Sequence, residues 1–306
     1  MDSSVCKSRQ DNQITFISTG TVKIKTAMKG QPITNRNVIM RRLRSLVDSQ
    51  WSEELPIGVF LISHPDGPVL FDTGESPHAN DPGFRRFWSP ISMFSITEID
   101  HADGIVPQLK VHGVEPRDLQ AIILSHLHGD HAGGLLELVT AAPDVPVYVS
   151  QDHWAAFGSS PVFATMQGCN PDRWPKPFNP RLYTFSDGRI GPWKHSSNIT
   201  SDGRIIVVPT PGHVPGHVSL IVRGVSPVGT ETTYLLPGDA TYSIDLLDKE
   251  EPDGINDDPL GALQSLKLIK QYAAQVELVV LPSHDPKTPK LLADRAVYVP
   301  KPTTVA

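Results

Sequence analysis

Residues 124–134 have the sequence LSHLHGDHAGG, and this stretch decides the fold and the chemistry that we expect. The apolar residues 121–124 lead into it and predict a short buried strand. His126 and His128 are two positions apart, so both imidazoles leave the end of this strand on the same side. The stretch therefore predicts a strand end that presents paired histidines.

The next residues add two further ligand types. Gly129 permits a turn, after which Asp130 and His131 return toward the same point at the start of a helix. Imidazole and carboxylate together suit Zn²⁺ and are acceptable to Mn²⁺ or Fe²⁺. A surface turn that is rich in histidine by chance would not lie at the carboxyl end of a buried strand, where α/β proteins place their sites. We therefore interpret the stretch as a metal site.

Composition supports this interpretation and excludes others. The chain has 306 residues, twelve of them His and two Cys, Cys6 and Cys169. Two cysteines exclude a disulfide framework and a four-thiolate metal site. The longest apolar runs have six residues, which suits a buried strand and not a membrane span. Because residues 1–12 are polar, without a secretory signal, we expect a flexible N-terminus and a cytoplasmic protein.

The formal net charge of −6 argues against a nucleic-acid partner, because the chain lacks a global basic surface. One basic cluster lies among apolar residues at helical spacing, and we interpret it as the solvated face of a helix. Its members are Arg36, Arg41, Arg42 and Arg44.

The order of apolar runs predicts two packed sheets with helices outside, in which each half contributes strands and a helix. We expect strands at residues 14–17, 22–24, 57–63, 69–72, 121–124, 145–149, 205–208, 217–222, 233–236 and 276–281. The first two would form a hairpin around Gly20, and the next two a hairpin around Gly67. We expect helices at 131–139 and, with the clearest apolar spacing, at 259–273.

Other ligand-type residues follow distant strands in the same way. His213 and His217 follow the strand at 205–208, Asp239 follows the strand at 233–236, and His284 follows the strand at 276–281. Each of these strands ends in Pro or Gly before the ligand-type residue. The recurrence of this arrangement predicts that several strand ends meet at one site.

The pattern HxHxDH at 126–131, followed by His213, Asp239 and His284, resembles the metallo-β-lactamase superfamily. The resemblance implies an α/β fold of the αββα type: two mixed β-sheets flanked by helices, with a dinuclear metal site in the cleft between the sheets. It implies a first metal held by His126, His128 and His213, a second held by Asp130, His131 and His284, and a bridging Asp239. Asp72 matches the superfamily's early strand-end motif, in which it would orient the ligand loop.

The residues also narrow the activity within this superfamily. The bridging position is Asp239, not the Cys of many antibiotic-cleaving members, and the absence of Glu at the second ligand position argues against a flavodiiron oxidoreductase. Tyr242 follows Asp239 by three residues, which is similar to the N-acyl homoserine lactonases, as is the sequence TPGHVPGH at 210–217. A phenol placed there can donate to a developing oxyanion.

We therefore expect a dinuclear metal-dependent hydrolase that opens a lactone-type ring by attack of a metal-bridging hydroxide. Asp130, Asp239 and Tyr242 would be its catalytic residues, with either carboxylate relaying the proton. Zn²⁺ is favoured, and the substrate would be a small molecule with a cyclic ester or amide carbonyl. The open alternatives are a lactam or carbamate-ring hydrolase, a thioester hydrolase similar to glyoxalase II, a mononuclear iron persulfide oxygenase and a non-catalytic binding protein.

Three further expectations concern organisation. Residues 13–300 would form a single domain, with an insertion rich in Pro and aromatic residues at about 151–200 that would fit a substrate lid. We expect His217 to support the site and not to bind metal, and we leave a homodimer open. Candidate residues for the pocket wall are Trp51, Phe87, Trp88, Trp154, Phe157, Phe163, Trp174 and Phe178.

Overall fold

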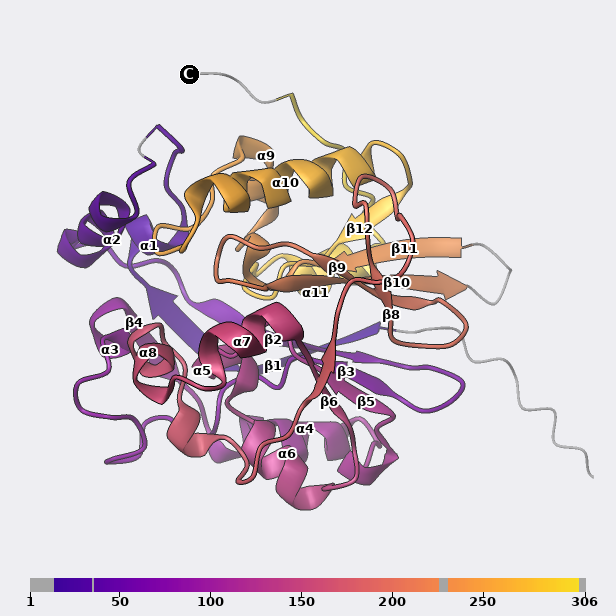
Figure 1. Ribbon diagram of the computed structural model, residues 1–306, viewed down its shortest axis with the longest axis horizontal. Coiled ribbons are helices and arrows are strands. Elements are labelled where there is room, and N and C mark those ends of the chain that lie inside the picture. Colours follow the sequence, from indigo (N-terminus) through magenta and orange to yellow (C-terminus); the bar gives the residue numbers. More distant parts are fainter. Residues whose placement is uncertain (1–13, 35, 226–230, 303–306) are drawn as a thin grey trace, which may run out of the picture.

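The computed structural model describes residues 14–34, 36–225 and 231–302, and its strands form two sheets that pack face to face (Figure 1). In spatial order the larger sheet contains β4 (Ser95–Glu98), β1 (Ile14–Ile24), β2 (Leu55–Ile62), β3 (Val69–Phe71), β5 (Ala121–Ile123), β6 (Val147–Ser150) and β7 (Arg181–Tyr183). The smaller sheet contains β12 (Leu278–Val280), β11 (Glu231–Leu236), β10 (Val218–Val225), β9 (Ile205–Pro209) and β8 (Ser197–Asn198). Both sheets mix parallel and antiparallel pairs. The N-terminal segment that we expect to be flexible lies outside the described residues.

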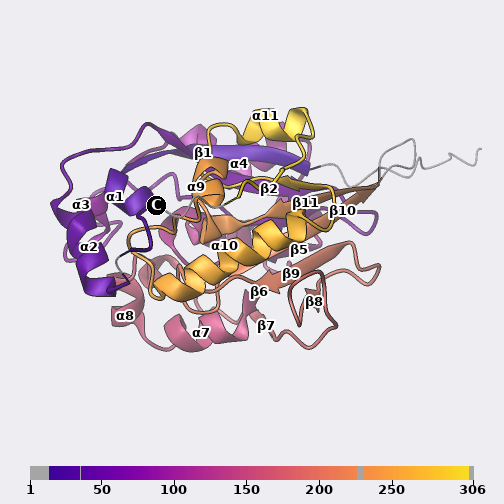
Figure 2. The ribbon, with the colours of Figure 1, turned by 90° about the horizontal axis from the view of Figure 1, so that it is seen from above.

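The chain also contains helices, several of which cover the outer faces of the two sheets. In the described residues they are α1 (Thr26–Lys29), α2 (Val38–Val47), α3 (Ile91–Phe94), α4 (Ile105–Val111), α5 (Gly129–Ala132), α6 (Leu135–Ala141), α7 (Gln151–Phe157), α8 (Pro161–Met166), α9 (Ile244–Lys249), α10 (Pro259–Ala273) and α11 (Thr288–Ala293). Short 3₁₀ turns occur at His101–Asp103, Pro116–Asp118, Pro171–Arg173 and, as η4, Gly238–Ala240. Figure 1 shows α4 and α6 below the larger sheet and α10 above the smaller one, and Figure 2 shows α10 lying across the strands.

Three apolar layers hold this arrangement together. Between the sheets, Phe60 and Phe71 of the larger sheet share one buried cluster with Val207 and Leu220 of the smaller sheet. A second cluster joins the larger sheet to α4, α6 and α7, and a third joins the smaller sheet to α10. The order is helices, sheet, sheet, helices. The αββα architecture implied by the sequence is therefore confirmed.

The helix predicted at 259–273 is confirmed at the same bounds. Asp258 begins it, since its side chain accepts hydrogen bonds from the backbone N–H groups of Leu260 and Gly261. Pro259 occupies the first helical position, where a missing N–H has no cost. Leu266 and Ile269 then lie on the buried face.

Two of the predicted elements are wrong. Residues 14–24 form one long strand, β1, and not a hairpin around Gly20. The residues between Ser18 and Thr21 make an irregularity in the pairing with β2, and the strand then continues. The helix expected at 131–139 is split into α5 and α6 because the N–H groups of Gly133 and Gly134 donate to the carbonyl of Gly74, outside the helix.

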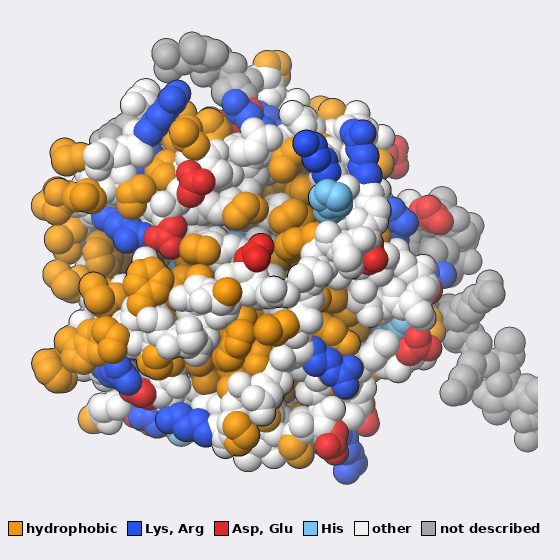
Figure 3. All heavy atoms as spheres, viewed as in Figure 1, with side chains coloured by type: hydrophobic (Ala, Val, Ile, Leu, Met, Phe, Trp, Pro, Cys, Tyr) orange, Lys and Arg blue, Asp and Glu red, His pale blue; other side chains and the backbone are white. Residues whose placement is uncertain are grey.

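The basic helix exists as α2, but its orientation differs from the solvated basic face that we expected. Arg41 is only 1% exposed, whereas the apolar Ile39 and Val47 are 69% and 77% exposed. Figure 3 shows hydrophobic side chains gathered on this side of the molecule, at the left. The prediction is therefore wrong for Arg41, whose guanidinium finds buried carbonyl acceptors that a helix pattern cannot reveal.

None of the helices in the described part of the chain combines the length and the apolar character that a membrane crossing requires.

Candidate metal centre

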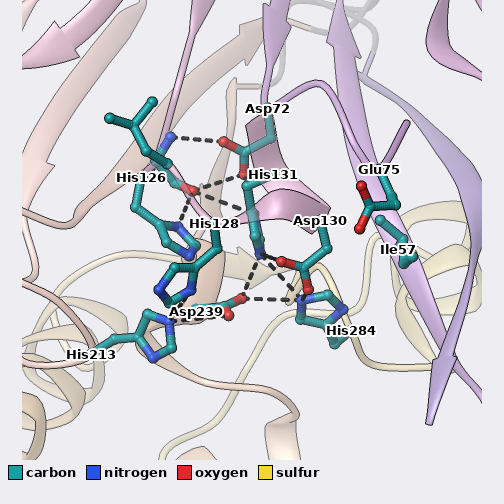
Figure 4. A network of polar contacts seen from close by, with 12 residues as sticks. Ile57, Asp72, Glu75, His126, His128, Asp130, His131, His213, Asp239 and His284 are labelled. Atoms are coloured by element: carbon teal, nitrogen blue, oxygen red, sulfur yellow. Dashed lines mark hydrogen bonds and ion pairs between the residues drawn. The ribbon is translucent and has the colours of Figure 1, made fainter. Parts of the chain in front are cut away.

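Five segments from both sheets bring ligand-type side chains to one end of the sandwich (Figure 4). His126 and His128 follow β5, and α5 carries Asp130 and His131. The other three come from the smaller sheet: His213 follows β9, Asp239 lies in η4 after β11, and His284 follows β12. These side chains form two groups, each with its nitrogen and oxygen atoms within 4.8 Å of one another.

The first group contains His126, His128, His213 and Asp239. The Nδ1 atom of His128 lies 3.1 Å from Nε2 of His213, and Nε2 of His213 lies 3.5 Å from Oδ2 of Asp239. Nε2 of His126 is buried and has no hydrogen-bond partner in the structure. A buried polar nitrogen without a partner is costly, unless a ligand completes it.

The second group contains Asp130, His131 and His284. The Nε2 atoms of His131 and His284 face each other at 3.3 Å. The Asp130 carboxylate lies 3.6 Å from Nε2 of His284 and 4.0 Å from Nε2 of His131. Its side chain is 29% exposed, so this group has an open side.

Asp239 belongs to both groups. Its Oδ1 atom lies 3.1 Å from Nε2 of His131 and 3.2 Å from Nε2 of His284, while its Oδ2 atom faces His213. One carboxylate oxygen is thus directed at each group (Figure 4). The carboxylate occupies the position that a bridging ligand requires.

The electrostatics fit a divalent cation. Burial lowers the pKa of His126 and of His128 well below the ordinary value, so both imidazoles are neutral and offer lone pairs. Burial also opposes a charge on His131, but the carboxylates of Asp239 and Asp72 outweigh it and raise the pKa of His131 well above its ordinary value. The buried carboxylates therefore require positive charge nearby, and a bound cation would supply it in place of protons. Imidazole nitrogens and carboxylate oxygens are a donor set that Zn²⁺ accepts.

Three of the histidines in the two groups have an acceptor at Nδ1 that fixes the tautomer of the ring. Nδ1 of His131 lies 2.8 Å from Oδ2 of Asp72, and Nδ1 of His284 lies 2.8 Å from the carbonyl oxygen of Pro56. Nδ1 of His213 lies 3.2 Å from Oδ2 of Asp253. A proton held on each Nδ1 leaves the lone pair of Nε2 directed into the site.

Asp72 makes the contacts that the orienting role implied by the resemblance requires. Besides His131, it accepts hydrogen bonds from the backbone N–H and the hydroxyl of Ser125, at 2.7 and 2.9 Å. Its φ of 64° lies in the left-handed region, where a residue other than Gly is uncommon. Gly74 follows at φ 67°, and a Cβ there would lie 2.0 Å from Oγ1 of Thr19. The hydrogen bonds of this one carboxylate to Ser125 and to His131 stabilise the strained conformation.

Two other buried histidines support the site from outside the groups. His217, as expected, is not among the grouped residues, and its Nε2 accepts the backbone N–H of Asp239 at 3.1 Å. His153 accepts the N–H of Leu127 at 2.9 Å, and its Nδ1 lies 2.7 Å from the carbonyl of Pro215. The sequence analysis left His153 without a role.

Tyr242 lies against both groups. Its ring stacks on that of His284 at a centroid distance of 5.1 Å, and it lies 6.4 Å from that of His213. Burial, with the charges of Asp239 and Asp253, raises the pKa of Tyr242 well above its ordinary value. The phenol therefore keeps its proton and acts as a hydrogen-bond donor.

A pocket opens beside His128, Asp130 and Asp239, with walls from residues 84–97 and 165–174. The second segment lies within the insertion that we expected to fit a lid. The predicted aromatic wall is mostly wrong: Trp174 lines this pocket, but Phe157 packs in the core and Phe87 is fully exposed. Periodicity cannot separate these cases, because an aromatic residue suits a core and a pocket equally well.

Sequence reasoning missed two acidic residues near the site. Glu75 is buried beneath Gly129 and forms an ion pair with Arg85 in the pocket wall. Glu75 directly follows the Asp72-Thr73-Gly74 motif, and this position is a sequence signal from which it could have been identified. Asp253 has no such signal, since it lies in an irregular segment 40 residues after His213.

Comparisons with known proteins agree with this geometry. The N-acyl homoserine lactonase AttM of Rhizobium radiobacter is 28% identical over 234 residues, which cover 76% of this chain and 83% of AttM. An N-acyl homoserine lactonase of a Bacillus species is 30% identical over 240 residues, covering 76% of this chain and 82% of its own. A solved N-acyl homoserine lactone hydrolase, with the product N-hexanoyl-L-homoserine at its catalytic metal centre, superposes with a TM-score of 0.67 at 25% identity and covers 95% of this chain and 98% of its own.

The family model described as the metallo-beta-lactamase superfamily matches residues 54–284, from β2 to the last histidine of the second group. This range includes both ligand groups and most of both sheets. The resemblance inferred from the sequence is confirmed: the chain belongs to the metallo-beta-lactamase superfamily.

Proposed function

We propose that this protein is a dinuclear metal-dependent hydrolase that opens the lactone ring of N-acyl homoserine lactones or related cyclic esters. The observation that carries the proposal is the placement of Asp239 between two histidine-containing groups, with the protonated Tyr242 against both. The relatives described above are named as N-acyl homoserine lactonases, which supports the same substrate class.

The proposal assigns each side chain a role. His126, His128 and His213 would hold the first metal, Asp130, His131 and His284 would hold the second, and Asp239 would bridge them. With two divalent ions bound, these residues would hold the Lewis acids that polarise a carbonyl oxygen and that lower the pKa of water enough to give a hydroxide nucleophile near neutral pH. Zn²⁺ is the favoured ion because the donors are imidazole and carboxylate and no thiol is required.

Tyr242 and Asp130 have the remaining roles in ring opening. The hydroxyl of Tyr242 donates a hydrogen bond to the ester carbonyl oxygen as negative charge develops on it, a contribution of about 2.7–4 kcal/mol for a single donor. The carboxylate of Asp130 is on the open side of the site, so it can take the proton from the attacking water and pass it to the leaving ring oxygen. The new bond joins the water oxygen to the carbonyl carbon, the ring C–O bond breaks, and the product is a hydroxy acid.

A substrate panel tests the proposal. The protein would be loaded with Zn²⁺, Mn²⁺ or Fe²⁺ and assayed on N-acyl homoserine lactones, simple lactones, β-lactams and glutathione thioesters. We expect the lactones to be hydrolysed with the largest kcat/KM and their products to be hydroxy acids. Preferred hydrolysis of lactams or thioesters would replace the substrate class, and no hydrolysis with two metals bound would refute the proposed function.

The finer expectations about organisation stay predictions. Size-exclusion chromatography with light scattering would measure whether the protein is a homodimer. Limited proteolysis would test whether residues 13–300 behave as one domain and whether 151–200 is an insertion. Fractionation of the source cells would test the cytoplasmic location.

A further inference from the structure

A short segment outside both groups, residues 252–257, contacts His213 in two ways. Oδ2 of Asp253 lies 3.2 Å from Nδ1 of His213. The backbone N–H of Asp257 lies 3.0 and 3.1 Å from the carbonyl oxygens of Gly212 and His213. The segment therefore fixes both the ring and the backbone of His213.

This segment is held in turn by the basic helix α2, to which the proposed reaction assigns no role. The buried guanidinium of Arg41 donates from Nη2 to the carbonyl oxygens of Pro252 and Asp253, at 3.0 and 2.8 Å. From the neighbouring position, Arg42 donates from Nε to the carbonyl of Ile255 at 3.2 Å and pairs with the Asp257 carboxylate. Two consecutive arginines thus hold the segment along most of its length.

The packing against α1 leaves the segment little freedom. The N–H of Gly254 donates to the carbonyl of Met28 at 2.8 Å, and a Cβ on Gly254 would lie 2.0 Å from the carbonyl oxygen of Ala27. Gln31 donates its backbone N–H to Pro252 at 3.0 Å. The segment can move only if α1 and α2 move with it.

We propose that Asp253, in the segment held by Arg41 and Arg42, is a positioning residue that fixes the tautomer and orientation of His213 for metal binding. This inference rests on the proposed function in one respect, the assignment of His213 as a ligand. It gives Arg41 and Arg42, two members of the basic cluster, a role other than nucleic-acid contact.

The hydrogen-bond pattern explains why a carboxylate is needed. Asp253 accepts on both oxygens: Oδ1 takes the N–H of Ile255 at 2.9 Å, and Oδ2 takes the Nδ1 proton of His213. An amide has one acceptor oxygen and a donor nitrogen. Asn at this position would therefore either oppose the N–H of Ile255 or force the proton of His213 onto Nε2, where it would block the lone pair.

Metal titration of the Asp253→Asn protein tests this role without substrate. We expect one of the two metals to bind about 10–100-fold more weakly, the usual effect of losing a partner of a ligand histidine, while the other keeps its affinity. The d–d absorption of the Co²⁺-substituted protein should change for the same metal. Unchanged affinities and an unchanged Co²⁺ spectrum would overturn the proposal.

Asp248→Asn is the matched control. Asp248 is also buried and also accepts on both oxygens, from the hydroxyl of Tyr298 at 2.9 Å and from Lys301 at 2.6 Å, but it does not contact either ligand group. The Asp248→Asn protein should keep both metal affinities. If it lost as much affinity as the Asp253→Asn protein, the loss would be due to general destabilisation, and the positioning role would be overturned.

A second variant decides the matter if Asp253→Asn fails to fold. Arg42→Gln loosens the segment from a half-buried position, and we expect a several-fold weaker affinity for the same single metal. No change in affinity would overturn the proposal. Because these readouts use metal alone, two metals bound by the wild type without lactone hydrolysis would refute the proposed function and leave this inference standing.

Discussion

The two ligand groups are similar in composition but differ in what holds them. In the second group, His131 is fixed by Asp72, directly after β3, and His284 by the carbonyl of Pro56 in β2. In the first group, His213 is fixed by Asp253, in an irregular segment between α9 and α10. Both groups include residues that follow β5 of the larger sheet, but His213 of the first group also depends on a loop that α1 and α2 hold.

This difference has an energetic consequence. A strand position is fixed by a ladder of backbone hydrogen bonds, which a single side-chain substitution does not remove. A loop position is fixed by a few side-chain contacts, each worth about 0.5–1.5 kcal/mol, or more when a charge takes part. The affinity of the first metal should therefore depend on residues distant from it, and the affinity of the second should depend mainly on its neighbours.

Replacing Asp239 should have the largest effect on metal binding and activity, because Asp239 is the residue that both groups share. Asn in its place has one oxygen and can serve only one group. We expect the Asp239→Asn protein to lose at least one metal and about 10³-fold in kcat/KM, which corresponds to the several kcal/mol that such ions contribute. Metal analysis and lactone kinetics measure both quantities. Two tightly bound metals with full activity would show that Asp239 does not bridge.

Tyr242→Phe should separate catalysis from metal binding in both groups. The ring keeps its stacking on His284 and only the donor hydroxyl is lost. We expect both metal affinities to stay within about twofold and kcat to fall by about 10²-fold, from the loss of about 2.7 kcal/mol of oxyanion stabilisation. A loss of metal would instead place Tyr242 among the residues that hold the site, and an unchanged kcat would remove it from the reaction.

The contrast between the groups also shows what the sequence could predict. All seven ligand-type residues were found because each follows an apolar run that forms a strand, and a strand end is a local pattern. Asp72 was identified because it matches the superfamily's early strand-end motif. The architecture followed from the order of these runs, and the bounds of α10 followed from its apolar spacing.

The remainder depends on contacts between distant residues. Nothing near Asp253 indicates that it reaches His213, and nothing in the spacing of α2 indicates that its Arg41 is buried on carbonyl oxygens while Ile39 is exposed. The hairpin predicted at 14–24 failed for a related reason. Gly20 favours a turn locally, but pairing with β2 and β4 on either side keeps the strand extended.

Asp72→Asn tests, at the second group, whether the two groups are supported separately. Asn tolerates the positive φ and can still accept the N–H of Ser125, so the substitution removes Oδ2, which accepts from Nδ1 of His131 and from the hydroxyl of Ser125. We expect about 10–100-fold weaker binding of one metal, and it should be the metal that Asp253→Asn leaves unaffected. Co²⁺ spectra of the two variants would show which metal changes. If both variants weakened the same metal, the two groups would not be separately supported.

The smallest effect should come from His153, and only below neutral pH. His153 joins the N–H of Leu127, between two ligands of the first group, to the carbonyl of Pro215, and burial lowers its pKa from 6.5 to about 4. The unfolded chain therefore binds more protons between these values, so the stability that neutral His153 contributes is complete above about pH 6.5 and is lost as the pH falls toward 4. At pH 5 the loss should be roughly 2 kcal/mol, at about 1.4 kcal/mol per pH unit.

Other buried imidazoles add to the acid sensitivity of the wild type, but the difference in stability between the wild type and the His153→Gln protein isolates the contribution of His153. Gln keeps one donor and one acceptor and does not titrate, so the variant should be about 1 kcal/mol less stable than the wild type at pH 7, nearly equal to it near pH 6 and about 1 kcal/mol more stable at pH 5. Urea unfolding of both metal-free proteins at pH 7, 6 and 5 measures this reversal, and a constant difference would show that His153 does not couple the loop of the first group to pH.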